Sequence, residues 1–251
     1  MKKVKSILVS QPAPTAENSP YFDIEKKHKI KIDFRPFIHI EGATTREVRH
    51  QKIDLSNYDA VILTSRNAVD HYFRIAEEMR FQVPIGTKYF CISEAVANYL
   101  QTYIVYRKRK IYVGERTIED LVEVLKKYKE EKFLFPTSNS LKPIIPKTLK
   151  AAKIKYDRVE LFRTVVSDLS DLENVFYDIL VFFSPTGIDS LLKNFPNFKQ
   201  KDTRIAVYGK VTKTAVEKAG FKCDIIVPNT ETRSMTTALE NYTMEANKRK
   251  R

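Results

Sequence analysis

Two serines stand where an apolar run of the chain gives way to an amphipathic pattern. They are Ser65 in "YDAVILTSRNAVDHYF" and Ser184 in "YDILVFFSPTGIDSLL". Serine is a preferred helix N-cap, and the first turn of a helix leaves N–H groups unpaired and carries about half a positive charge. A helix start of this kind binds carboxylate or phosphate. The two segments therefore predict anion binding at two strand-to-helix turns, and helix capping alone remains the alternative for each serine.

Other hydroxyl, amide and cationic residues also fall at expected strand ends or helix starts. Pro185 suits the first helical position, and Gly187 would let a ligand approach the backbone closely. Thr232, Arg233 and Ser234 continue the series. The residues predicted to bind a ligand with several anionic groups are Ser65, Arg66, Asn67, Ser93, Thr137, Ser138, Asn139, Ser184, Thr186, Gly187, Gly209, Lys210 and Thr212.

The elements that must position these residues are short apolar strands alternating with helical patterns along the whole chain. This alternation predicts parallel sheets covered by helices on both faces. The two serine segments recur at one constant spacing, shared by the pairs Asp59/Asp178, Ser65/Ser184 and Asp70/Asp189. A similar match pairs Ser93 with Gly209 in the units that follow. A barrel of eight equal units would have a shorter period, so the repeat favours two similar domains.

The expected fold class is α/β, with two similar flavodoxin-like parallel-sheet domains joined by a two-stranded β connector. Two segments, 29–40 and 155–166, lack a following helix and are expected to pair as that connector. The expected domains are 1–36 plus 165–245, then 37–164, followed by a basic disordered tail at 246–251. One domain would thus be discontinuous in sequence.

The charge of the chain favours anionic partners. Its 251 residues hold 44 Lys+Arg against 31 Asp+Glu, a net charge of +13, although ordinary solvated surface charge is an equal alternative. The basic residues are spread along the chain rather than clustered, which argues against nucleic acid as a partner. The start of the chain has too short an apolar run for a signal peptide, and no run approaches the roughly 18 residues of a membrane span. We expect a soluble, cytoplasmic monomer without a membrane partner.

Several common chemical motifs are missing from the sequence. There is no GxGxxG, no GxxxxGK[ST] and no GxSxG, and the segment "YVGERT" around Gly114 is expected to be a simple strand-to-helix turn. The four histidines show no metal-ligand spacing, and Cys91 and Cys223 lie far apart without a CxxC pattern. We therefore expect no metal and no cofactor.

The order of the segments resembles the uroporphyrinogen-III synthase family over nearly the whole chain. The similar segments are "LVSQP", "TSRNAV", "ISEAVANYL", "FLFPTSNSLKPIIPKTLKAAKIKYDRVELFRTV", "VFFSPTGIDSLL" and "AVYGKVTKTAVEKAG". The resemblance implies a bilobed, cofactor-free lyase of tetrapyrrole biosynthesis. Its substrate would be hydroxymethylbilane, a linear tetrapyrrole with eight carboxylates, which is cyclised with inversion of ring D and loss of water. The alternative is a non-catalytic two-domain protein that binds an anionic metabolite.

The resemblance also implies roles for individual residues, although some of the family's residues are replaced in this chain. It implies substrate binding by Ser65, Ser184, Gly209 and Thr212. The family's tyrosine, discussed as assisting loss of the hydroxyl, matches Phe162, so no phenol stands at that position. This chain departs from the family at three other positions, where Gln11 stands in place of an arginine, Ser93 in place of a glycine and Val96 in place of a threonine. Thr212 and Tyr208 are the catalytic candidates that remain.

Overall fold

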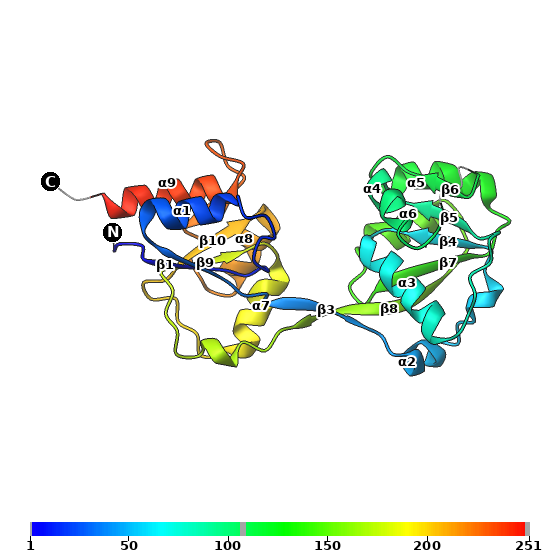
Figure 1. The fold of residues 1–251 in the computed structure, drawn as a ribbon, viewed down its shortest axis with the longest axis horizontal. Helices are drawn as coiled ribbons and strands as arrows, with labels where there is room; N and C mark the ends of the chain where they lie inside the picture. Colours follow the sequence, from blue (N-terminus) through cyan, green and yellow to red (C-terminus); the bar gives the residue numbers. More distant parts are fainter. Residues whose placement is uncertain (1, 106–108, 249–251) are drawn as a thin grey trace. The chain divides into compact units, whose positions relative to one another are not determined.

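The computed structural model describes residues 2–105 and 109–248, in which short strands alternate with helices (Figure 1). The strands are β1 (Ser6–Val9), β2 (Lys31–Phe34), β3 (Ile38–Gly42), β4 (Ala60–Leu63), β5 (Lys88–Cys91), β6 (Ile111–Val113), β7 (Phe133–Ser138), β8 (Tyr156–Val166), β9 (Ile179–Phe182), β10 (Arg204–Tyr208) and β11 (Ile225–Val227). The helices are α1 (Pro20–His28), α2 (Thr45–His50), α3 (Arg66–Glu78), α4 (Glu94–Leu100), α5 (Ile118–Leu125), α6 (Ile144–Ala151), α7 (Pro185–Asn194), α8 (Lys210–Lys218) and α9 (Met235–Asn247). Short 3-10 turns are η1 (Leu55–Asn57), η2 (Lys126–Tyr128) and η3 (Ser170–Leu172).

The chain divides into two compact units. The first consists of Met1–His39 and Val165–Arg251, and the second is the continuous stretch Ile40–Thr164. Each unit holds one sheet within the described residues. The order of strands is β2-β1-β9-β10-β11 in the first sheet and β8-β7-β4-β5-β6 in the second, where β3 adds an edge strand beside β8. The predicted α/β class with two parallel-sheet domains is confirmed.

The first sheet has the flavodoxin-like order, in which the first strand lies between the second and the third. The second sheet contains the same spatial series with a different path of the chain. Its central strand β4 corresponds to β9, and β5 and β6 correspond to β10 and β11, whereas β7 and β8 take the places of β1 and β2. The repeat that links Ser65 to Ser184 in the sequence thus relates the turns after two equivalent central strands, one in each sheet.

The segment 29–40 does not behave as one connector strand. Residues 31–34 form β2, which pairs in parallel with β1 inside the first sheet, and only the residues from Ile38 onward form the strand beside β8. The break falls at Arg35–Pro36, since proline cannot donate to a sheet ladder. Helix α2 also follows β3 directly, where no helix was expected. The amino-terminal part of β8, in turn, pairs in parallel with β7.

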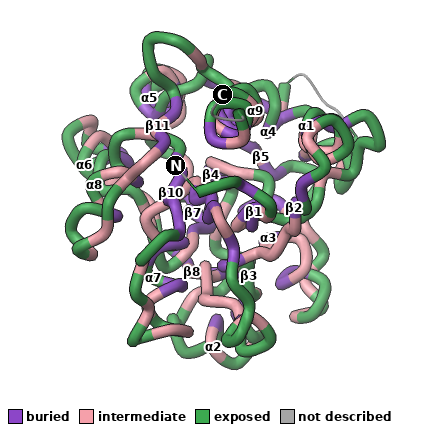
Figure 2. Tube along the Cα trace, turned by 90° about the vertical axis from the view of Figure 1, so that its left-hand side faces the viewer, coloured by how far each residue is buried: buried purple, intermediate pink, exposed green. Residues whose placement is uncertain are grey.

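Each sheet is buried by two pairs of helices. Helices α1 and α9 pack on one face of the first sheet and α7 and α8 on the other. Helices α3 and α4 cover one face of the second sheet, and α5 and α6 cover the other. All four residues of the central strands β4 and β9 are buried, and Figure 2 shows the buried residues gathered along the strands. This two-sided burial explains why these strands read as continuous apolar runs.

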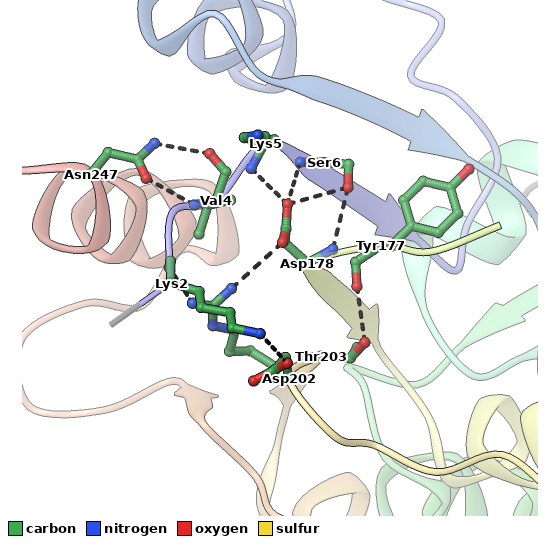
Figure 3. A network of polar contacts seen from close by, with 10 residues as sticks. Lys2, Val4, Lys5, Ser6, Tyr177, Asp178, Asp202, Thr203 and Asn247 are labelled. Carbon is green, nitrogen blue, oxygen red and sulfur yellow. Dashed lines mark hydrogen bonds and ion pairs between the residues drawn. The ribbon is translucent and has the colours of Figure 1, made fainter.

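Residues near both ends of the described chain are hydrogen-bonded at the amino edge of the first sheet (Figure 3). The carboxylate of Asp178 accepts hydrogen bonds from the backbone N–H groups of Lys5 at 2.7 Å and Ser6 at 3.0 Å. The Asn247 side chain bonds both the N–H and the carbonyl of Val4, at 2.8 and 2.9 Å. Asn247 ends helix α9, so the expected disordered tail from 246 is wrong at its start; residues 249–251 lie outside the described residues.

Candidate functional site

The carboxyl edge of the second sheet carries several of the predicted residues. Parallel strands end at a common edge, and here β4 is followed by Ser65, β5 by Ser93 and β7 by Asn139. The backbone N–H of Ile92 donates to the carbonyl of Leu63 at 2.9 Å, which holds the ends of β4 and β5 together. The sheet thus brings these three turns into neighbouring positions along one edge.

The two serines at this edge differ in what their hydroxyls do. Ser65 caps α3, and its Oγ accepts a hydrogen bond from the backbone N–H of Ala68 at 3.1 Å. Ser93 is the N-cap residue of α4, but its side chain makes no capping hydrogen bond. Both residues are half-buried. Capping therefore accounts for the Ser65 hydroxyl, whereas the Ser93 hydroxyl is available to a ligand.

Arg66 is an exposed cation at the same edge, and the half-buried Asn67 follows it. The Arg66 guanidinium lies 5.3 Å from the centre of the Tyr99 ring, which comes from the neighbouring helix α4. The Tyr99 hydroxyl donates to the Asp70 carboxylate at 2.8 Å, and this bond raises the pKa of Tyr99 above its usual value. A guanidinium over an aromatic ring keeps its N–H groups free for an anion.

The side chain of Thr137, which was predicted to bind a ligand, is turned into the protein. It is only 3% exposed, and its Oγ1 accepts a hydrogen bond from Nε of Arg158 at 2.9 Å. The same arginine donates through Nη2 to the Ser138 carbonyl at 2.9 Å and pairs with Glu160. These bonds lie at the irregularity between Thr137 and Ser138, where the register of β7 with β8 shifts. Thr137 therefore positions Arg158, and Asn139 is the exposed polar residue of this turn.

Ser184 and Gly187 lie at the carboxyl edge of the first sheet, at the start of α7. Ser184 is the N-cap and makes no side-chain capping bond, and Thr186 beside it is half-buried. Gly187 is buried, and a Cβ atom added there would lie 3.1 Å from the Phe182 ring. The glycine therefore lets α7 pack closely against β9. Its predicted role in admitting a ligand to the backbone stays a prediction.

Gly209 shapes the neighbouring turn through its backbone. Its φ of 85° and ψ of 150° belong to a region that is essentially restricted to glycine, and an added Cβ would meet no atom within 4 Å. Its N–H donates to the Val227 carbonyl at 2.6 Å, so this amide is not free for a ligand. The unpaired amides of the turn are those of the first residues of α8, beginning at the exposed Lys210.

The two catalytic candidates differ sharply in exposure. Tyr208 ends β10 with 44% of its surface exposed, and its ring centre lies 6.2 Å from that of Phe183. Thr212 lies in the first turn of α8 and is 2% exposed, so its side chain is buried inside that turn. Of the two candidates, Tyr208 is therefore the one whose hydroxyl-bearing side chain is exposed.

Phe162 stacks on a histidine that sequence reasoning left aside. The ring centres of Phe162 and His71 lie 5.0 Å apart with 16° between their planes. Phe162 is the register partner of Ser138, so this stacked pair lies beside the turn after β7. Within residues 2–105 and 109–248, no cluster of three or more His, Cys, Asp or Glu side chains could hold a metal ion.

Comparisons with known proteins agree on one family. The family model described as uroporphyrinogen-III synthase HemD matches residues 24–237. A protein of Methanocaldococcus jannaschii named "Putative uroporphyrinogen-III synthase" is 27% identical over 205 residues, which covers 76% of this chain and 82% of that protein.

Two solved structures share the fold. The crystal structure of uroporphyrinogen-III synthetase from Helicobacter pylori matches with a TM-score of 0.61 at 16% identity, over 95% of this chain and 98% of that one. A mutant uroporphyrinogen III synthase from Thermus thermophilus matches with a TM-score of 0.52 at 13% identity, over 95% and 97% of the two chains. At such identities the likeness concerns the fold.

Proposed function

The chain belongs to the uroporphyrinogen-III synthase family of tetrapyrrole biosynthesis, and we propose that the carboxyl edges of its two sheets bind the carboxylates of hydroxymethylbilane. The enzyme is a lyase that closes this linear tetrapyrrole into a ring with inversion of ring D and loss of water. Family membership argues against the alternative of a non-catalytic metabolite-binding protein. The observation that carries the proposal is that each sheet has a parallel strand followed by an N-cap serine whose hydroxyl makes no capping bond, Ser93 after β5 and Ser184 after β9.

The reaction needs control of geometry more than strong acid–base groups. Loss of the terminal hydroxyl leaves an electrophilic azafulvene, and attack by the substituted carbon of the last pyrrole gives a spiro intermediate that rearranges. Closure without an enzyme gives the uninverted isomer, so the protein must hold the carboxylates where only one attack geometry is reached. Hydroxyls, helix-terminal amides and a few cations perform that task.

The structure supports particular residues for this binding role. Serine hydroxyls at Ser93 and Ser184 are uncommitted, and Arg66 and Lys210 are exposed cations at the same edges. The backbone amides at the starts of α3, α7 and α8 add donors that have no intrahelical partner. Asn67, Ser138, Asn139 and Thr186 line the same turns.

The proton for loss of the hydroxyl needs a donor other than Phe162. Tyr208 supplies an exposed phenol at the end of β10, beside the turn that Gly209 shapes. Thr212 supports the first turn of α8 from inside. We therefore assign Tyr208 as the proton donor and Thr212 as a residue that positions the amides of α8.

We also propose that the protein acts as a cytoplasmic monomer with this small-molecule substrate as its partner and without nucleic acid. No helix in the described part of the chain is long and apolar enough to cross a membrane. The basic residues are distributed over many elements rather than gathered in one segment. This distribution supports a partner whose carboxylates bind at separate turns rather than one continuous polyanion.

The deciding experiment supplies hydroxymethylbilane, oxidises the products and separates isomers III and I. The proposal predicts that isomer III dominates with the protein present. Isomer I alone, as in buffer, would remove the enzymatic assignment. A protein that only binds the tetrapyrrole would show saturable affinity without any change in the ratio of isomers.

A further inference from the structure

The turn between β6 and α5 lies tightly against the end of β5. A Cβ atom added at Gly114 would lie 3.1 Å from the backbone nitrogen of Leu121 and 3.2 Å from the carbonyl oxygen of Ile92. These are backbone atoms, which give way less easily than the end of a side chain, so a larger residue at this position would crowd them. The N–H of Gly114 also donates to the Cys91 carbonyl at 2.9 Å. The turn is thereby fixed next to Ser93, which directly follows Ile92.

A capping box holds the residues that follow Gly114. The Thr117 side chain accepts from the backbone N–H of Asp120 at 3.3 Å, and the Asp120 carboxylate accepts from the backbone N–H of Thr117 at 2.9 Å. The same carboxylate accepts from the N–H of Arg116 at 3.2 Å. The backbone at Arg116 is therefore held by its own N–H bond and by that of Thr117, so the side chain projects from a defined position.

The Arg116 side chain is exposed and has no ion-pair partner within the described residues. Within the described residues Arg46, Arg49, Arg66, Arg80, Arg109 and Arg233 are also outside any ion pair, whereas five other arginines each meet a carboxylate. These pairs are Arg35–Asp171, Arg74–Glu78, Arg158–Glu160, Arg163–Glu41 and Arg204–Asp178. Gly114 and the capping box hold the backbone around Arg116 in place, while the guanidinium of Arg116 stays unpaired in the described part of the chain.

Arg116 and Arg66 stand on the two sides of Ser93. Strand β5 lies between β4 and β6 in the sheet, and the residues after these three strands are Ser65–Arg66, Ser93 and the turn of Gly114 to Thr117. Neighbouring strands are about 4.8 Å apart, so the two turns that carry arginines are separated by about twice that spacing. Two guanidinium groups with a hydroxyl between them suit a molecule that carries several carboxylates.

We propose that Arg116 is a further carboxylate-binding residue of the substrate site, acting beside Arg66 and Ser93. This inference rests on the proposed function, because hydroxymethylbilane supplies the carboxylates. The planar fork of an arginine binds a carboxylate through two parallel N–H···O bonds, which fixes orientation as well as position. Since the side chain supports no other part of the fold, its removal weakens binding and leaves stability unchanged.

The test compares Arg116→Gln with Arg80→Gln. Arg80 is also an exposed arginine of the second unit, but it follows the end of α3, about 20 Å along that helix from its start. The probe is uroporphyrin, the oxidised octacarboxylate form of the product, titrated by its fluorescence. We expect Arg116→Gln to raise the Kd roughly tenfold, as loss of one charge-assisted contact does. Arg80→Gln keeps the wild-type Kd.

Kinetics with hydroxymethylbilane give a second readout. Arg116→Gln raises KM with a smaller change in kcat, and Arg116→Lys lies between it and the wild type because lysine keeps the charge without the fork. Equal Kd and KM for Arg116→Gln and Arg80→Gln would overturn the inference and leave the enzymatic function in place if the wild type forms isomer III. A wild type that forms isomer I alone would overturn the function, and the uroporphyrin titration would still decide the role of Arg116.

Discussion

Arg74 and His71, one turn apart on α3, are joined by a hydrogen bond in which Nε–H of Arg74 donates to Nδ1 of His71 at 3.1 Å. The bond requires a neutral imidazole, with its proton on Nε2. The other end of the guanidinium donates through Nη2 to the carbonyl of Ala43 at 2.8 Å and approaches that of Leu161 at 3.4 Å. Arg74 therefore ties α3 to the chain just after β3 and to β8.

The first prediction concerns the pH dependence of stability. Burial, and then the charge of Arg74, lower the pKa of His71 below its ordinary value of 6.5, while Asp70 and Glu78 oppose this shift. Stability that depends on the neutral ring is complete above about pH 6.5 and is lost as the pH falls through the lowered pKa. We expect the urea midpoint of the wild type to fall over this range, and that of His71→Gln to fall less. Parallel curves for the two proteins would contradict this account.

The second prediction concerns Gly42, which makes room for Arg74. A Cβ atom added at Gly42 would lie 2.7 Å from Nη2 of Arg74 and 3.0 Å from Cε1 of His71. Gly42→Ala must displace the guanidinium and lose its bonds to the carbonyls, so the free energy of unfolding falls by about 1–2 kcal/mol. Denaturant unfolding measures this change.

Two controls belong to the same experiment. Gly86→Ala meets no atom within 4 Å and has no left-handed φ, so it changes stability by less than about 0.5 kcal/mol. In an Arg74→Met background the space at Gly42 is no longer filled by a guanidinium, and Gly42→Ala then costs little. Additive effects of the two substitutions would show that Arg74 is not what the glycine accommodates.

The elements of the fold could be predicted better than their connections. Continuous apolar strands and the repeat between Ser65 and Ser184 predicted two parallel-sheet domains, because burial on both faces leaves a local pattern. The permuted path of the second sheet leaves no such pattern, since the order of parallel strands depends on contacts between distant segments. The segment 29–40 looked like one extended connector for the same reason, because only Pro36 marks the break between two strands in different surroundings.

Site residues could be predicted where local backbone geometry determines the residue type. They were harder to predict where the hydrogen-bond partners of a side chain determine its position. Serines before a helix and Gly209 at a turn follow from local rules of conformation. Thr137 is hydrogen-bonded to Arg158, which lies on the neighbouring strand β8. In the sequence Arg158 is only one charged residue within an alternating pattern, so this pairing could not be predicted. Gly114 was expected to form a simple turn, although its lack of a side chain and its N–H bond to the Cys91 carbonyl hold the turn that leads to Arg116 close to β5.

The third prediction separates effects on stability from effects on activity at the two glycines that flank α8. Gly209 precedes the helix with a φ of 85°, and Gly220 follows it with a φ of 79°. Alanine at either position is strained, and we expect a loss of about 1–3 kcal/mol in each case. Only Gly209→Ala alters the turn at the carboxyl edge, so turnover of hydroxymethylbilane falls for that variant and persists for Gly220→Ala at temperatures where both are folded. Equal turnover would argue against a binding role for the start of α8.

The fourth prediction compares Thr212 with His71. Thr212 lies inside the first turn of α8, behind the amides that we assign to carboxylate binding, whereas His71 packs on Phe162 in the other unit. We expect Thr212→Ala to lower turnover roughly tenfold, a loss equivalent to one good hydrogen bond, and His71→Ala to lower it less. Thr212→Ser keeps the hydroxyl and retains activity, and Thr212→Val keeps the volume and does not. If the valine variant turns over as fast as the serine variant, the hydroxyl has no part in positioning α8, and the role of Thr212 is packing alone.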